Sequence, residues 1–253
     1  PPAQVALTPA RIPLIKPRLK VAVGDRVKLG SLLCEDKRDA RLRFLSPGGG
    51  EVVDIRFGPR RVIDAIVIAL EEEEPAVPFA VLSGERIKGM TREALVEHLL
   101  QGGLWPLIKA LPFRAIAPPD ESPPAIYVGL GGLEPFQARP ELYLQGRRPV
   151  FELGMALLGR LAPEVRLGLP LERGETLQAL THLASFEFKG PYPSDDPGVH
   201  CYHQKRDPAE NRCWFIHGQD LLLLAELGVD RLPRKRLRLS RMGADGPERS
   251  ACR

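Results

Sequence analysis

The sequence predicts a mixed fold in which a small all-β domain precedes an α/β domain, and three observations support this. Between Leu19 and Leu70, short apolar runs alternate with glycine and proline turns and show no helical period, which indicates a small sandwich or barrel. The acidic stretch 71–74, followed by Pro75 and Pro78, then breaks the pattern. Beyond it, strand-like and helix-like segments alternate, as in a parallel sheet with crossover helices.

These observations divide the chain into three parts. We assign residues 1–74 to the β domain, residues 75–230 to the α/β domain and residues 231–253 to a basic tail. In the β domain we expect strands at 21–23, 41–45, 52–55 and 61–70, with a turn at 46–50. In the α/β domain we expect strands at 125–128, 165–169 and 213–216, and helices at 91–100, 150–161 and 220–227.

Two segments do not fit this alternation. Residues 186–198 are rich in proline, glycine and aspartate, and are too long for a simple connector, so we expect a functional or interface-forming loop. The tail from Arg236 to Ser240 alternates like one strand without an obvious mate in the chain. We therefore expect this end of the protein to dock on another protein chain through aromatic anchors, which are Phe186, Phe188, Tyr192 and Tyr202.

Composition excludes several classes of protein. No apolar run is long enough to cross a bilayer and no signal peptide opens the sequence, so we expect a protein that does not span the membrane. The four cysteines form no CxxC pair, which removes the commonest zinc and iron–sulfur signatures. Most of the net charge of +4 lies near 231–241. A GC-rich genome that favours arginine codons would explain these residues, and the alternative is contact of the basic stretch with phosphate or anionic lipid. With so few interleaved aromatics, we expect no nucleic-acid binding.

Three stretches, in order, resemble the A subunits of the sodium-translocating NADH:quinone oxidoreductases. The first runs from Val23 through Glu35-Asp36-Lys37 and Ser46-Pro47 to Arg60-Arg61-Val62. The second is Gly103-Leu104-Trp105 followed by Pro112-Phe113, and the third is Gly190-Pro191, Gly198-Val199-His200, Trp214 and Gln219-Asp220. The chain departs from the family in three places. Gly132 and Glu134 stand where the family has an aspartate and an asparagine. A leucine, Leu111, stands in the basic pair before Pro-Phe, and tyrosines replace two of three histidines around His200.

The resemblance implies a barrel-sandwich-hybrid domain of the lipoyl type followed by a Rossmann-like domain, with the tail as the start of a β-grasp-type domain. It implies a peripheral, cofactor-poor subunit on the cytoplasmic side of the inner membrane, which is not catalytic alone. The complex would oxidise NADH, reduce quinone and transport sodium, with flavins and an iron–sulfur cluster on partner chains and no covalent cofactor on this chain. The alternatives are an adaptor of another membrane electron-transfer complex, such as an Rnf-like one, and a lipoyl or biotinyl carrier.

Several residues invite a functional interpretation, and each has a structural one. In the quinone-binding interpretation, Trp105 and Phe113 would stack on the ring while Lys109, His200 or Tyr202 donates to its carbonyl oxygens; in the structural one the two aromatic residues are core anchors. We identify no catalytic constellation and assign no metal site. The ligand types His200, His203, Cys213 and His217 match no common zinc spacing, and an i, i+3 pair on a strand would face opposite ways.

Two other features are weaker indications of a functional site. Lys37 invites comparison with lipoyl carriers, but the tip of its hairpin is expected near Asp39, so we expect no modification. Gly129-Leu130-Gly131-Gly132 follows a strand like a phosphate-binding loop, but it completes no GxGxxG motif, and a tight turn is the simpler interpretation.

Overall fold

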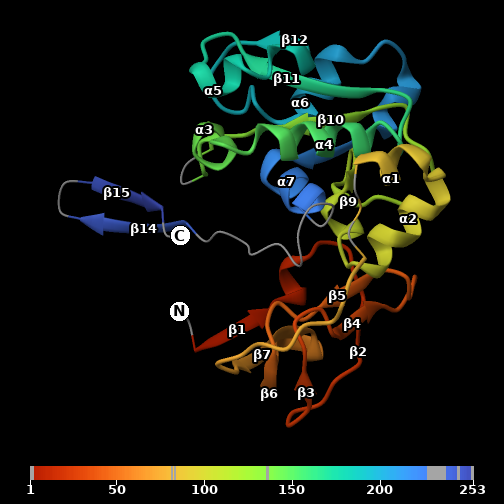
Figure 1. Cartoon of the computed structure of the whole chain (residues 1–253), viewed down its shortest axis with the longest axis vertical. Helices are drawn as coiled ribbons and strands as arrows, with labels where there is room; N and C mark the ends of the chain where they lie inside the picture. The colour runs from red at the N-terminus through yellow and green to blue at the C-terminus, as the bar shows by residue number, and fades with distance from the viewer. Residues whose placement is uncertain are drawn as a thin grey trace. The chain divides into compact units, whose positions relative to one another are not determined.

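The computed structural model describes residues 3–80, 82, 84–134, 137–226, 238–243 and 246–251, with side chains described up to residue 226. Internal contacts divide the chain into two compact units (Figure 1). The first contains residues 1–80, 91–108 and 114–119, and the second contains residues 81–90, 109–113 and those from 120 onward. The boundary predicted between residues 74 and 75 stays a prediction.

The first unit is built from short antiparallel strands. One sheet has the order β1 (Gln4–Leu7), β7 (Ile63–Leu70), β6 (Gly50–Phe57) and β3 (Arg26–Val27). The other has the order β2 (Pro17–Leu19), β4 (Leu32–Asp36) and β5 (Arg43–Leu45). This confirms the predicted β domain, and the turn predicted at 46–50 joins β5 to β6. The strand predicted at 21–23 is absent, because these residues lie in the connection between β2 and β3. Apolar side chains between the sheets form its core, and these are Val27, Leu33, Cys34, Phe44, Val52, Ile63, Ile66 and Ile68.

Short elements complete the first unit: η1 (Pro9–Arg11), η2 (Pro59–Arg61), α2 (Arg92–Gln101), η3 (Trp105–Leu107) and β9 (Ala115–Ile116). Helix α2 begins where the sequence predicted, because the Thr91 hydroxyl accepts a hydrogen bond from the Ala94 N–H at 3.2 Å. Its buried side chains Leu95, Val96, Leu99 and Leu100 form the apolar face that the spacing predicted.

A mainly parallel sheet organises the second unit. Its strands have the order β12 (Ala184–Phe188), β11 (Val165–Pro170), β10 (Ile126–Gly129), β13 (Trp214–His217) and β8 (Lys109–Ala110). The first four are parallel, and β8 is antiparallel to β13. The chain fills the sheet outward from β10 to β12 and then returns to the other side of β10 with β13. The predicted parallel sheet is therefore confirmed.

Helices connect and cover these strands: α1 (Gly84–Gly89), α3 (Pro140–Leu144), α4 (Arg148–Leu158), α5 (Glu175–Gln178), η4 (Thr181–Leu183), α6 (Pro197–Gln204), η5 (Pro208–Arg212) and α7 (Gly218–Glu226). Right-handed crossovers that run in opposite directions along a sheet place their helices on opposite faces, which applies to α4 and α6. Helices α4 and α7 pack closely at Gly154, where a Cβ atom would come within 2.8 Å of the Leu221 side chain.

The structure corrects two expectations for the C-terminal half. Residues 186–198 are not one long loop, because β12 extends to Phe188 and α6 starts at Pro197. The strand expected from Arg236 does have a mate in the chain, since β14 (Arg238–Gly243) pairs with β15 (Gly246–Ala251) in an antiparallel hairpin. A strand without a mate therefore no longer supports the predicted docking partner. Residues 231–237 of the basic tail lie outside the described residues.

Candidate functional site

A hollow of the second unit lies at the carboxyl ends of its parallel strands. The segments that follow β10, β11 and β12 surround a cavity of about 510 Å³, lined by residues 130–133, 139–141, 170–172 and 188–191 together with Leu177 and Asp195. Loops at this edge converge because parallel strands all end there, and ligands of open α/β sheets bind in this position.

The glycine-rich turn after β10 forms one wall of this cavity. Gly131 and Gly132 have φ angles of +69° and +114°, which favour glycine. The Gly132 N–H donates to Gln137 Oε1 at 2.7 Å, and the Leu133 N–H donates to the Asp195 carboxylate at 3.0 Å. Side-chain oxygens of the chain thus already accept hydrogen bonds from two backbone N–H groups that a bound phosphate would need as donors. This geometry favours the tight-turn interpretation over nucleotide binding.

A second, smaller hollow of about 150 Å³ lies between the ends of β10 and β13, where the strand order reverses. It is lined by Leu130, Gln137, Ala138, Tyr143, His217, Gln219 and Asp220. The Tyr143 hydroxyl donates to the Leu130 carbonyl at 2.5 Å, and burial raises the pKa of that hydroxyl above its usual range. The hollow therefore places the side-chain amides of Gln137 and Gln219 near one carboxylate at the start of α7, that of Asp220.

The predicted quinone contacts fall in different environments. Trp105, in the first unit, is fully buried and its indole N–H donates to the Ala117 carbonyl at 2.7 Å. In the second unit, Lys109 lies on β8, where burial lowers the pKa of its ammonium group and Asp220 opposes that shift. Phe113 is 80% exposed and Tyr202 is 68% exposed. The three aromatic rings thus differ widely in their access to a ligand.

His200 is a core residue of the second unit. Its Nε2 donates to the Ser194 carbonyl at 2.8 Å, and its ring packs against Phe186 and Phe188 with centroids 5.0 Å and 4.7 Å away. Burial lowers the pKa of its imidazole. Two of the four predicted docking aromatics, Phe186 and Phe188, therefore pack within the unit, whereas Tyr192 is 55% exposed.

The argument that a strand would turn His200 and His203 to opposite faces does not apply, because these residues are helical. They lie on α6, which Pro197 begins and the Asp196 carboxylate caps by accepting from the Gly198 N–H at 2.7 Å. The two side chains still do not converge, because His200 is buried and His203 is exposed. In the described part of the chain, no three His, Cys, Asp or Glu side chains gather in a way that could hold a metal ion.

Lys37 lies directly after β4 and not at the tip of its hairpin. Its N–H donates to the Lys16 carbonyl at 2.8 Å, while the turn closes through the bond from the Leu42 N–H to the Asp39 carbonyl at 3.0 Å. The tip is therefore near Asp39, as predicted from the spacing.

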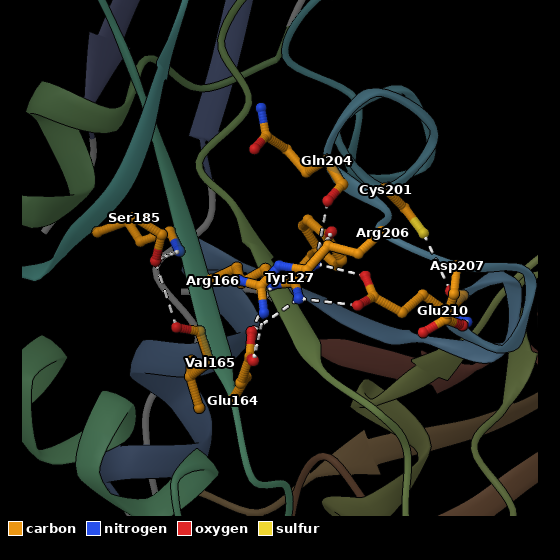
Figure 2. A network of polar contacts seen from close by, with 11 residues as sticks. Tyr127, Glu164, Val165, Arg166, Ser185, Cys201, Gln204, Arg206, Asp207 and Glu210 are labelled. Atoms are coloured by element: carbon orange, nitrogen blue, oxygen red, sulfur yellow. Dashed lines mark hydrogen bonds and ion pairs between the residues drawn. The ribbon is translucent and has the colours of Figure 1, made fainter.

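Sequence reasoning missed a polar network at the opposite, amino-terminal side of the sheet (Figure 2). Arg166, on β11, donates to the Glu210 carboxylate at 2.6 and 3.1 Å and to the Tyr127 hydroxyl at 2.7 Å. Glu164 also accepts from it, and Arg206 donates to Glu164 at 3.0 Å. The signal was present in the sequence, because an arginine inside the apolar run 165–169 needs a buried partner.

Comparison with known families accounts for both units. A model described as the NqrA N-terminal barrel-sandwich hybrid domain matches residues 1–71, and one described as the NqrA second alpha/beta domain matches residues 90–229. The second match alone covers more than half of the chain. The chain belongs to the NqrA family. This confirms the resemblance and the fold class that the sequence predicted.

Relatives of this family cover most of the chain. The A subunit of the Na(+)-translocating NADH-quinone reductase of Pseudomonas aeruginosa is 33% identical over 215 residues, which is 84% of this chain and 47% of that protein. The corresponding proteins of Saccharophagus degradans and Vibrio alginolyticus are 32% and 30% identical, over 84% and 86% of this chain and 48% and 50% of their own lengths. The chain thus spans about half the length of the curated relatives it matches. Among the described residues, no helix has the length and apolar character needed to cross a membrane.

Proposed function

We propose that this chain acts as a peripheral subunit of a membrane-bound, sodium-translocating NADH:quinone oxidoreductase. One observation carries the proposal: two models of the same family match the chain in the family's order, and each match falls on a fold of the corresponding type. The names of the relatives supply the reaction, since each is the A subunit of a Na(+)-translocating NADH-quinone reductase. Partner chains would then carry the flavins and the iron–sulfur cluster, and this chain would lie on the cytoplasmic side of the inner membrane.

In this proposal the chain contributes to assembly and to quinone reduction and holds no covalent cofactor. Of the five predicted quinone contacts, Phe113 and Tyr202 offer exposed rings, and Lys109 offers a partly buried ammonium donor. The ring N–H groups of Trp105 and His200 already donate to backbone carbonyls. These two residues would therefore contribute to the site by packing in the core. Arginines of the segment 231–241 would lie near anionic lipid.

Affinity purification from the source organism tests the assignment to a complex. A tagged chain, extracted from membranes in mild detergent, should co-purify with chains that carry flavin and an iron–sulfur cluster, together with sodium-stimulated NADH:quinone reductase activity. Recovery with the chains of a different electron-transfer complex would support the adaptor alternative instead. Recovery of the chain alone would contradict both.

Variants of the exposed tyrosines locate the contact. Changing Tyr192 and Tyr202 to Ala should reduce the yield of co-purified chains, because both rings are more than half exposed. Leu142→Ala is the matched control, since Leu142 is a similarly exposed apolar side chain on α3. Equal loss in the control would show a general effect of removing apolar surface.

Quinone contact needs its own test. A photoreactive quinone analogue added to the purified complex should label peptides that contain Phe113 or Tyr202, and excess natural quinone should suppress the labelling. Phe113→Leu should reduce the labelling, because it removes the ring, whereas the control Leu142→Val should leave it unchanged. Labelling confined to other chains of the complex would remove the quinone role from this chain and leave its place in the complex untouched.

A further inference from the structure

The hairpin of β6 and β7 ends in a tip with an unusual backbone. The two strands pair from Gly50 and Leu70 to Phe57 and Ile63 (Figure 1). The turn beyond them is closed by the Val62 N–H, which donates to the Pro59 carbonyl at 3.3 Å. We call residues 57–62 the β6–β7 tip.

Both central residues of this turn lie in the left-handed region. Arg60 has φ 58° and ψ 26°, and Arg61 has φ 56°. Tight hairpin turns with two such residues strongly favour Asn-Gly or a similar pair, because a bulky side chain is sterically disfavoured there. The demands of the turn therefore do not explain two arginines. Strained positions that keep an unfavourable residue are concentrated at functional sites.

The side chains of the tip combine positive charge with exposed apolar surface. Phe57 is 49% exposed and Val62 is 48% exposed, one on each side of the arginine pair. The Arg61 guanidinium lies 5.8 Å from the centre of the Phe57 ring. Within the described part of the chain, neither Arg60 nor Arg61 forms an ion pair. By contrast, Asp54 neutralises Arg56 in the adjoining strand, with Nε 2.8 Å from Oδ2.

We propose that the β6–β7 tip docks on the surface of an anionic phospholipid bilayer. Arg60 and Arg61 would donate to lipid phosphate groups, while Phe57 and Val62 would insert at the level of the headgroups. A flat bilayer fits this tip better than an acidic protein surface, because a convex turn with apolar groups flanking its charges needs no complementary hollow. The inference rests on the proposed function for its setting, since it specifies how a peripheral subunit would contact the membrane.

Vesicle binding by the full chain tests this directly. Binding to phosphatidylcholine vesicles that contain a quarter of phosphatidylglycerol should exceed binding to pure phosphatidylcholine, and added salt should reduce it. The double variant Arg60→Asn with Arg61→Gly should lose at least about tenfold in partitioning. The same variant should unfold at an equal or higher urea concentration, because Asn-Gly suits the turn. A misfolded variant therefore cannot explain the expected loss.

Three further variants define the chemistry. Arg60→Lys with Arg61→Lys should retain most of the binding, and Phe57→Ala should lose part of it at every salt concentration. Arg11→Asn with Arg212→Asn removes the same charge from two exposed sites elsewhere and should bind like the parent chain. If this control loses as much as the tip variant, net charge and not the tip is responsible, and the inference fails.

The other possible results also decide whether the tip docks on a membrane. Absence of binding to anionic vesicles by the parent chain, or undiminished binding by the Asn-Gly variant, overturns the inference. Vesicle binding that persists in this variant while its recovery with the complex falls would assign the tip to a protein contact. The proposed function is tested separately. It stands if the Asn-Gly variant still assembles with the complex and the complex purified in detergent is active, whatever the vesicle binding of the variant.

Discussion

The guanidinium of Arg166 lies against the carboxylate of Glu210, with Nη1 2.6 Å from Oε2 and Nη2 3.1 Å from Oε1. Both side chains are more than nine-tenths buried. The pair ties β11 to the segment η5 that precedes β13, so it links two strands on opposite sides of β10. A bidentate pair of this kind both satisfies the buried charges and fixes the orientation of the groups.

Breaking this pair should destabilise the second unit. Glu210→Gln should lower the free energy of unfolding by roughly 3 kcal/mol, because the arginine would stay buried without a full counter-charge. Urea denaturation followed by circular dichroism measures this. Arg148→Met is the control, since Arg148 is exposed and its partner Glu152 is only partly buried, so the loss should be within about 0.5 kcal/mol. An unchanged urea midpoint for Glu210→Gln would show that water or another group replaces the carboxylate charge.

Stability should also depend on acid pH through the same group. The hydrogen bond from Arg166 holds the pKa of the Glu210 carboxyl below its usual range in the folded chain. Its contribution is therefore complete above the pKa of an unfolded glutamate, about 4.3, and is lost as the pH falls through the lower folded value. Unfolding free energy measured between pH 6 and pH 3 should fall less steeply in Glu210→Gln than in the parent chain. Parallel curves would assign the acid sensitivity to other carboxylates.

Much of the fold could be predicted because local patterns determined it. The Thr91 cap, the buried runs at 125–128 and 165–169, and the glycine-proline turn at 46–50 each use only neighbouring residues. Helix α6 was missed because its start combines Pro197 with Asp196 inside a loop-like composition, and the same residues also favour turns.

The candidate site was harder to predict because its contacts are long-range. The Leu133 N–H is bonded to Asp195, which lies 62 residues further along the chain. Likewise, no spacing rule pairs Arg166 with Glu210, 44 residues away. Sequence reasoning can detect that a buried arginine or a glycine turn needs a partner, but only the topology of the sheet decides which residue meets that need.

Trp105 offers a prediction that separates a core role from a ligand-stacking role. Trp105→Phe keeps an aromatic ring but leaves the buried Ala117 carbonyl without its donor, which should cost about 1–3 kcal/mol of stability. Trp105→Leu should cost more, because it leaves a larger cavity and removes the aromatic ring. Thermal unfolding measures both. A Phe variant that is as stable as the parent chain, but whose complex has a raised KM for quinone, would favour the stacking role instead.

The glycine turn after β10 yields the last prediction. The parent chain should not bind inorganic phosphate there, because Gln137 and Asp195 occupy the Gly132 and Leu133 N–H groups, and the Asp195 carboxylate would also repel an anion. Asp195→Ala combined with Gln137→Ala frees both donors beside the cavity and should create weak phosphate binding, detectable by phosphorus NMR titration. Asp195→Asn with Gln137 unchanged is the matched control: it removes the charge but keeps both acceptors, so it should remain unable to bind. Phosphate binding by the parent chain would show that a ligand displaces these side chains, and the turn would then be a phosphate-binding loop after all.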